Sequence, residues 1–88
     1  MSNYKAPVTD LRFALHDVLK AESLFAAMGL EDASADVIDA VLEEAGRFSA
    51  SVLAPLNAVG DEAGCTLDKA TGEVTTAPGF KEAYAQFV

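Results

Sequence analysis

Residues 35–53 read ADVIDAVLEEAGRFSASVL, and this stretch decides the fold of the chain. Its apolar side chains recur every three or four residues, which is the spacing of one continuous α-helical face. Ser34 precedes the stretch as an N-cap, and Asp36 falls in the first turn, where negative charge is favourable. The pattern predicts a helix about 28 Å long, which Pro55 ends or restarts. The apolar positions are Val37, Ile38, Val41, Leu42, Ala45, Phe48, Val52 and Leu53.

Two shorter helices are expected on either side of this central one. The segment LRFALHDVLKAESLFAAMGL, residues 11–30, carries helically spaced apolar residues and has a natural stop at Gly29. A last helix follows Pro78 and Gly79, because its apolar residues fall at i, i+3, i+4 and i+7. Between them, residues 65–76 read CTLDKATGEVTT, which predicts a short hairpin or an irregular segment. The predicted fold is therefore mainly α, with three helices.

The composition predicts one small domain with little stability of its own. The chain has 88 residues, and 51% of them are hydrophobic, which argues against disorder. A domain of this size buries only about 60% of its unfolded surface. Cys65 is the only cysteine, so no disulfide within the chain can add to this. A single thiol and no recognisable signal peptide predict a cytoplasmic location.

Charge excludes several classes of partner. Fourteen acidic residues against six basic ones leave a net charge of −8, so we expect no binding to nucleic acid. The longest uncharged run, FSASVLAPLNAVG, is too short for a membrane span. Most of the excess acid lies between Glu31 and Glu62. That segment is interpreted as a solvated helix face or, alternatively, as a docking face for a basic partner.

The residues that could carry chemistry do not form a recognisable site. His16 is the only histidine, and its neighbour Asp17 points elsewhere on a helix. Glu43 and Glu44 are also adjacent, so they do not form the carboxylate pair that acid–base catalysis needs. Cys65 has no evident cation beside it to activate the thiol. We therefore predict no catalytic, cofactor-binding or metal-binding residue in the chain.

The surroundings of one serine suggest a further class of protein. The sequence AESLF places Ser23 between an acid and a leucine, which resembles the modified serine of acyl carrier proteins. The carrier serine starts a helix, whereas the pattern here puts Ser23 inside one. An acyl-carrier-like protein is therefore the third of three hypotheses, and Ser23 is expected to carry no prosthetic group.

Three stretches together resemble the N-terminal region of large bacterial acyl-CoA dehydrogenases. YKAPVTDLRFALHDVL is similar to the N-terminal extension of that family. VLEEAGRFSASVLAPLNAVGDEAGCTL is similar to the first helix of the N-terminal helical domain and the loop after it, and EVTTAPGFKEAYAQFV to the start of the next helix. The resemblance implies an extension over residues 1–30 and the first part of the helical domain over residues 31–88.

This resemblance implies a parent enzyme that removes hydrogen from Cα and Cβ of an acyl-CoA with FAD as acceptor. The family's flavin-binding and catalytic positions lie further along the chain, so none can be transferred to this sequence. The first hypothesis is thus a non-catalytic segment that packs against the remainder of the dehydrogenase, and the second is an independent acidic module that binds a protein. Six residues are expected to form a packing or self-association surface: Phe13, Leu15, Val18, Phe80, Tyr84 and Phe87.

Overall fold

The computed structural model describes residues 3–88, which form two compact units. One unit is Lys5–Phe48, and the other contains Ser49–Val88 together with residues 3 and 4. The border between the units lies inside the predicted central helix. The predicted division into segments 1–30 and 31–88 was based on the family that the sequence resembles, and it stays a prediction.

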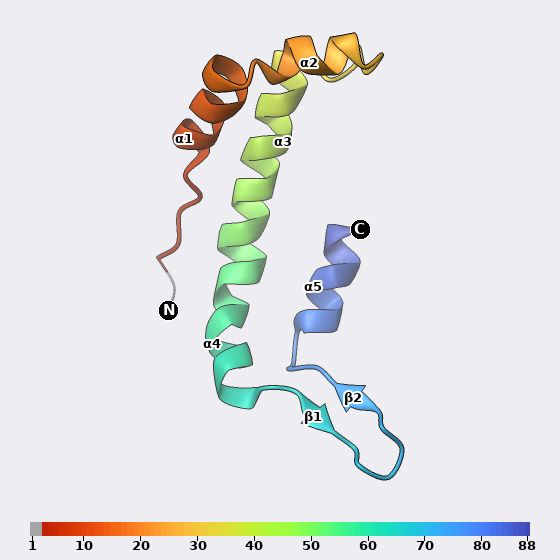
Figure 1. Cartoon of the computed structure of the whole chain (residues 1–88). Helices are drawn as coiled ribbons and strands as arrows, with labels where there is room; N and C mark the ends of the chain where they lie inside the picture. The colour runs from red at the N-terminus through yellow and green to blue at the C-terminus, as the bar shows by residue number, and fades with distance from the viewer. Residues whose placement is uncertain (1–2) are drawn as a thin grey trace. The chain divides into compact units, whose positions relative to one another are not determined.

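The first unit contains four helical elements. They are the α-helix α1 (Val8–Arg12), the π-helix η1 (Phe13–Val18), the α-helix α2 (Ala21–Ala27) and the long α-helix α3 (Ala35–Phe48). Figure 1 shows α1 running alongside α3 in the opposite direction. The two helices approach closely at Gly46, where an added Cβ would lie 3.2 Å from the Cβ of Ala6 and 3.3 Å from Val8.

The predicted first helix is interrupted at Lys20, and this was not foreseen. The backbone widens in η1, where the N–H of Leu19 donates to the carbonyl of Ala14 over 2.9 Å, five residues back. Lys20 then adopts φ 49° and ψ 51°, a left-handed conformation that ends the first helical run. A non-glycine residue seldom takes this conformation, and the sequence has no Gly or Pro there to indicate it. Two helical runs therefore replace the one predicted.

The end of α2 confirms the role predicted for Gly29. Gly29 has φ +83°, the left-handed conformation that a glycine adopts without steric cost. Its N–H donates to Ala26 over 3.0 Å, while the N–H of Leu30 donates to Phe25 over 2.8 Å. This pair of bonds is the Schellman motif, which satisfies carbonyls left open at a helix C-terminus. The chain can therefore turn from α2 toward α3.

The start of α3 is also as predicted. The hydroxyl of Ser34 accepts a hydrogen bond from the N–H of Val37 over 3.3 Å, and the Ser34 carbonyl accepts from Ile38 over 2.9 Å. Ser34 is thus the N-cap, and Asp36 lies in the first turn.

The second unit begins with helical backbone and ends with a helix. The π-helix η2 (Ser49–Leu53) is followed by the α-helix α4 (Ala54–Ala63), then by the strands β1 (Thr66–Leu67) and β2 (Val74–Thr75), and by the α-helix α5 (Phe80–Phe87). Pro55 lies in the first turn of α4, where its missing N–H is tolerated. The prediction that the helix ends or restarts at this proline was wrong, because η2 and α4 follow one another without a non-helical residue and Leu53 has helical φ −78° and ψ −43°.

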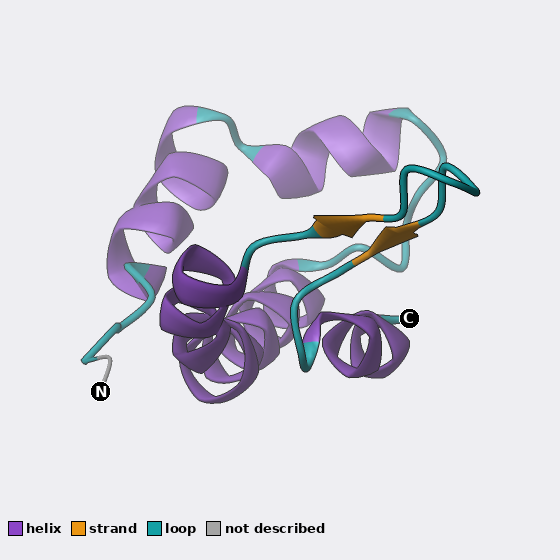
Figure 2. Cartoon of the chain, turned by 90° about the horizontal axis from the view of Figure 1, so that it is seen from below, coloured by secondary structure: helices purple, strands orange, loops and turns teal. Residues whose placement is uncertain are grey.

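The segment predicted as a hairpin or irregular loop is a short antiparallel hairpin (Figure 2). Thr66 pairs with Thr75, and Leu67 pairs with Val74. The turn is held locally, because the carboxylate of Asp68 accepts from the N–H of Ala70 over 2.9 Å. Both strands are exposed on both faces, so the hairpin adds almost nothing to a core.

The start of α5 packs against α4 through two glycines. The ring of Phe80 lies over Gly60, where an added Cβ would meet the ring at 2.7 Å. Leu56 lies equally close to a Cβ placed on Gly79, the N-cap of α5, which has φ +91°. Only glycine combines this conformation with this approach, so Gly79 fixes where α5 leaves the hairpin.

The buried core is small in both units. The described residues contain four buried apolar side chains, namely Ala21 and Ile38 in the first unit and Ala77 and Ala83 in the second. Three of the four are alanines, which contribute little apolar area each. A short chain is expected to bury little apolar surface, and the small number of buried side chains agrees with this expectation.

Candidate functional site

A cluster of four charged or polar side chains joins η1 and α1 to α3 in the first unit. The Nε2 of His16 lies 2.7 Å from Oδ1 of Asp39, and Nε of Arg12 lies 3.3 Å from the same oxygen. Arg12 also donates through Nη2 to Glu43. Asp39 and Glu43 are one turn apart on α3, and Arg12 and His16 are four residues apart in the N-terminal segment. The four side chains are called the Arg12 cluster below.

The electrostatics of the Arg12 cluster favour an ionised Asp39. The hydrogen bond with His16 lowers the pKa of Asp39 below its ordinary value of 3.8. Partial burial opposes this shift, and the positive charges of Arg12 and His16 add to it. An ionised carboxylate can only accept, so the nitrogen of His16 is the donor in this bond.

This arrangement ties α1 and η1 to α3. A histidine held by a carboxylate resembles part of a hydrolytic triad, but a triad also needs a hydroxyl or thiol within hydrogen-bond reach of the imidazole. Among residues 3–88 no such hydrogen bond to His16 is present. The guanidinium of Arg12 also pairs with both carboxylates of the cluster.

The pairing of His16 with Asp39 was missed from the sequence. The prediction that His16 does not pair with Asp17 looked only at its neighbour in the chain. A signal was present, because two basic residues spaced four apart match two acidic residues spaced four apart on the next long helix. The antiparallel approach of the two segments brings these pairs together.

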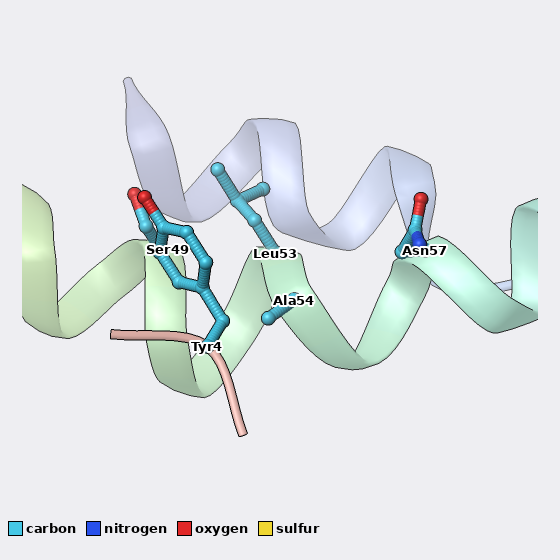
Figure 3. Close-up of a pocket in the computed structure, with 5 residues that line it drawn as sticks. All are labelled: Tyr4, Ser49, Leu53, Ala54 and Asn57. Atoms are coloured by element: carbon cyan, nitrogen blue, oxygen red, sulfur yellow. The ribbon is translucent and has the colours of Figure 1, made fainter. Parts of the chain in front are cut away.

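An open pocket of about 340 Å³ lies in the second unit, beside η2. Figure 3 shows the hydroxyls of Tyr4 and Ser49 close together at one end and the amide of Asn57 at the other. Leu53 and Ala54 lie between them. The lining is neutral, so the pocket offers no charge to a phosphate or a metal ion.

Ser23 lies inside a helix, as predicted, although this helix is shorter than expected. It is the third of the seven residues of α2 and is exposed. Ser23 lines a second open pocket of about 290 Å³ together with His16, Lys20, Glu22 and Ala35. Ser23 and His16 thus share a pocket without being hydrogen-bonded to each other in the described structure.

The other chemistry-bearing residues lie apart from these pockets. Cys65 is exposed at the entrance to the hairpin. Glu44 pairs with Arg47 over 2.6 Å, and this hydrogen bond raises the pKa of Arg47. Within the described part of the chain, no three His, Cys, Asp or Glu side chains are grouped to hold a metal ion. No helix there is long and apolar enough to cross a membrane.

The six residues predicted to form a packing surface divide between the two units. Phe13 and Val18 are exposed in the first unit, at 60% and 63%, whereas Leu15 is half-buried. In the second unit Phe80, Tyr84 and Phe87 are exposed, the last at 72%. Five of these six apolar side chains are therefore accessible, and the surface that they would form stays a prediction.

Comparison with known proteins supports the dehydrogenase resemblance. No known family model matches the chain. The chain is nonetheless similar to an acyl-CoA dehydrogenase, as the sequence analysis predicted. It is 38% identical over 85 residues, 97% of its length, to the 3-methylmercaptopropionyl-CoA dehydrogenase of Ruegeria pomeroyi. The chain spans only 14% of the length of that enzyme.

Proposed function

We propose that this chain is a non-catalytic helical segment of a flavin-dependent acyl-CoA dehydrogenase, corresponding to the N-terminal region of such an enzyme. The observation that carries the proposal is the 38% identity over 97% of the chain to an acyl-CoA dehydrogenase of which the match covers 14%. The mainly helical fold with one long helix is consistent with it.

Packing is the role that the described residues support. Among the described residues, each unit buries two apolar side chains and leaves many large ones exposed. Burial against a larger protein would remove this apolar surface from water, at about 25 cal/mol for each Å². Phe13, Leu15, Val18, Phe80, Tyr84 and Phe87 are our candidates for that contact.

The proposed parent reaction takes a proton from Cα of the acyl-CoA and transfers a hydride from Cβ to FAD. Neither of the two pockets described above fits the flavin itself. The larger pocket has a neutral lining, and in the smaller one Lys20 is accompanied by Glu22, so neither is built for a pyrophosphate. The flavin, the catalytic base and the substrate are accordingly assigned to other parts of the parent enzyme.

A segment exchange tests this proposal. The matching 85 residues of the Ruegeria pomeroyi enzyme are replaced by the aligned part of this chain, and bound flavin and dehydrogenation are measured by visible absorbance. We expect an enzyme that retains flavin, with kcat/KM within about tenfold of the parent. An unrelated acidic helical segment of the same length serves as control. An exchange enzyme no better than this control would contradict the proposal.

The isolated chain provides a second measurement. Mixed with FAD, it is expected to leave flavin fluorescence and absorbance unchanged, because neither described pocket fits the cofactor. Stoichiometric binding would be incompatible with a purely packing role.

The alternative function is that of an independent acidic module that binds a basic protein, and the net charge of −8 favours it. Three of the acids in the acidic segment, however, already pair within the chain: Asp39, Glu43 and Glu44. This leaves less free charge for a partner than the sequence suggests. The cytoplasmic location is a prediction common to both functions.

A further inference from the structure

The segment before α2 lies on α3 with little apolar burial. Residues 3–20 contain no buried side chain, and the two large apolar residues Phe13 and Val18 are exposed. Leu15, between them, is half-buried. Gly46, where this segment approaches α3 closely, contributes no side chain to the contact. The hydrophobic effect therefore contributes little to holding this segment on α3.

The Arg12 cluster provides the polar part of the same contact. Arg12 pairs with Asp39 and Glu43, and His16 lies 2.7 Å from Asp39. The side chains of these four residues are between 25% and 51% exposed. Ion pairs that water reaches are individually weak, and dissolved salt screens them. The contact between this segment and α3 should therefore weaken as the ionic strength rises.

The backbone changes conformation where this segment ends. Among residues 3–88, Lys20 is the only non-glycine residue with a positive φ. The next residue, Ala21, is 3% exposed and belongs to the small core of its unit. Hinges are single residues at the ends of elements that absorb a large change in φ and ψ. Lys20 has this position, because it separates a segment without buried side chains from a helix that is anchored at its first residue.

We infer that residues 5–19 form a strap that the Arg12 cluster holds on α3, and that this strap opens at Lys20 when other cations compete for Asp39 and Glu43. Opening leaves both carboxylates free to bind the competing cations. A change of Lys20 to a right-handed conformation also removes the steric cost of its present backbone.

The open strap should lose its helical structure while the following helices remain. Its two helices, α1 and η1, have 5 and 6 residues, and helices of this length are not stable in water without packing. The hydrogen bonds that end α2 at Gly29 and begin α3 at Ser34 do not involve the strap. Opening is therefore expected to be local to residues 5–19.

Amide hydrogen exchange of the whole chain, followed by mass spectrometry, tests this inference. Sodium chloride at about 0.05 M and about 1 M is the probe, because the screening length falls to about 3 Å at 1 M. We expect amides of the strap to exchange at least about threefold faster at the higher concentration, and amides of α3 to change less. Equal acceleration in the strap and in α3 would indicate general loosening and overturn the inference. Exchange of the strap that does not respond to salt would overturn it as well.

Two neighbouring glutamates provide matched variants. Glu43 pairs with Arg12 of the strap, whereas Glu44 pairs with Arg47 on α3 itself. Both are exposed acids in the same helix, so Glu43→Gln and Glu44→Gln make the same chemical change. Glu43→Gln should accelerate exchange of the strap at low salt by about threefold and reduce its response to salt. Glu44→Gln should leave both quantities at the wild-type values. Equal effects of the two substitutions would overturn the inference, because the net charge of α3 would then matter and the pairing with Arg12 would not.

Discussion

At the scale of single residues, Asp39 carries the most interactions that the sequence did not reveal. It accepts from His16 and faces Arg12, so it connects the N-terminal segment to α3. Its pKa is lowered in the folded state, which means that folding favours the ionised carboxylate. The stabilisation from Asp39 is therefore fully present above the ordinary pKa of 3.8 and is lost as the pH falls through the lower folded value.

The first prediction concerns this carboxylate. Asp39→Asn should lower the free energy of unfolding at about pH 5, and the difference from wild type should shrink as the pH falls below 3.8 and Asp39 becomes protonated. Urea unfolding followed by circular dichroism at a series of pH values measures it. Asp17→Asn, at an exposed neighbour of His16, is the matched control and should show little change. A difference that stays constant down to the lowest pH would contradict the assignment.

Lys20 provides the second residue-scale prediction. Its left-handed backbone costs a non-glycine residue roughly 1 kcal/mol, and it lies between η1 and α2. Lys20→Gly should therefore raise the free energy of unfolding by a few tenths to about 1 kcal/mol, after the added flexibility of the unfolded chain is subtracted. Lys20→Ala removes the charge without relieving the backbone, so it should bring no gain. Equal effects of the two substitutions would mean that the charge, and not the conformation, matters.

At the scale of helices and strands, local patterns predicted what local interactions decide. Ser34 caps α3, Gly29 ends α2, Pro55 lies in the first turn of α4, and the hairpin closes between residues 67 and 74. Each of these features depends on residues a few positions apart. The break at Lys20 has no such signal, because no glycine or proline is present to favour it.

Contacts between distant segments were less accessible to prediction. The helical spacing of apolar residues in 35–53 predicts a helix, but it does not predict on which side of the helix another segment packs. In the structure that choice is made by Gly46 and by the Arg12 cluster, which bring the N-terminal segment onto one side of α3. The candidate site was hidden for the same reason, since His16 and Asp39 are 23 residues apart.

The close approach at Gly46 provides the prediction at this scale. Gly46→Leu would place a side chain where Ala6 and Val8 already lie within 3.3 Å of a Cβ, so the segment containing α1 should separate from α3. Arg12 and Lys20 should then be cleaved faster by trypsin, which limited proteolysis with mass spectrometry can follow. Gly46→Ala is the control, because the small strain of its Cβ is offset by a better helix propensity. Unchanged cleavage in Gly46→Leu would show that the segment is held by other contacts.

At the scale of the whole molecule, the small amount of buried apolar surface governs behaviour. The four buried apolar residues of the described part of the chain, three of them alanines, cannot provide the stability of a typical domain. Exposed aromatic side chains occur in both units, including Phe13 and Phe87. A chain of this kind should either self-associate or be loosely folded when dilute.

The last prediction tests this expectation by sedimentation over a range of concentrations. Phe13→Asp should disperse self-association, because a carboxylate cannot be buried without a partner. Phe87→Asp, in the last turn of α5, should have a smaller effect because helix ends fray. Circular dichroism of the same samples reports whether dispersal is accompanied by unfolding. A wild-type chain that is monomeric and unfolds cooperatively at micromolar concentration would contradict the packing role and favour the independent module.

The exposed thiol of Cys65 has a practical consequence for experiments on association. Because it is the only sulfhydryl in the sequence, air oxidation can link two copies at one point and no further. The product would be a covalent pair that persists on dilution and disappears with dithiothreitol, unlike an assembly held by aromatic side chains. Running each sample with and without reductant on a denaturing gel therefore separates the two kinds of pair, and Cys65→Ser should abolish only the covalent one.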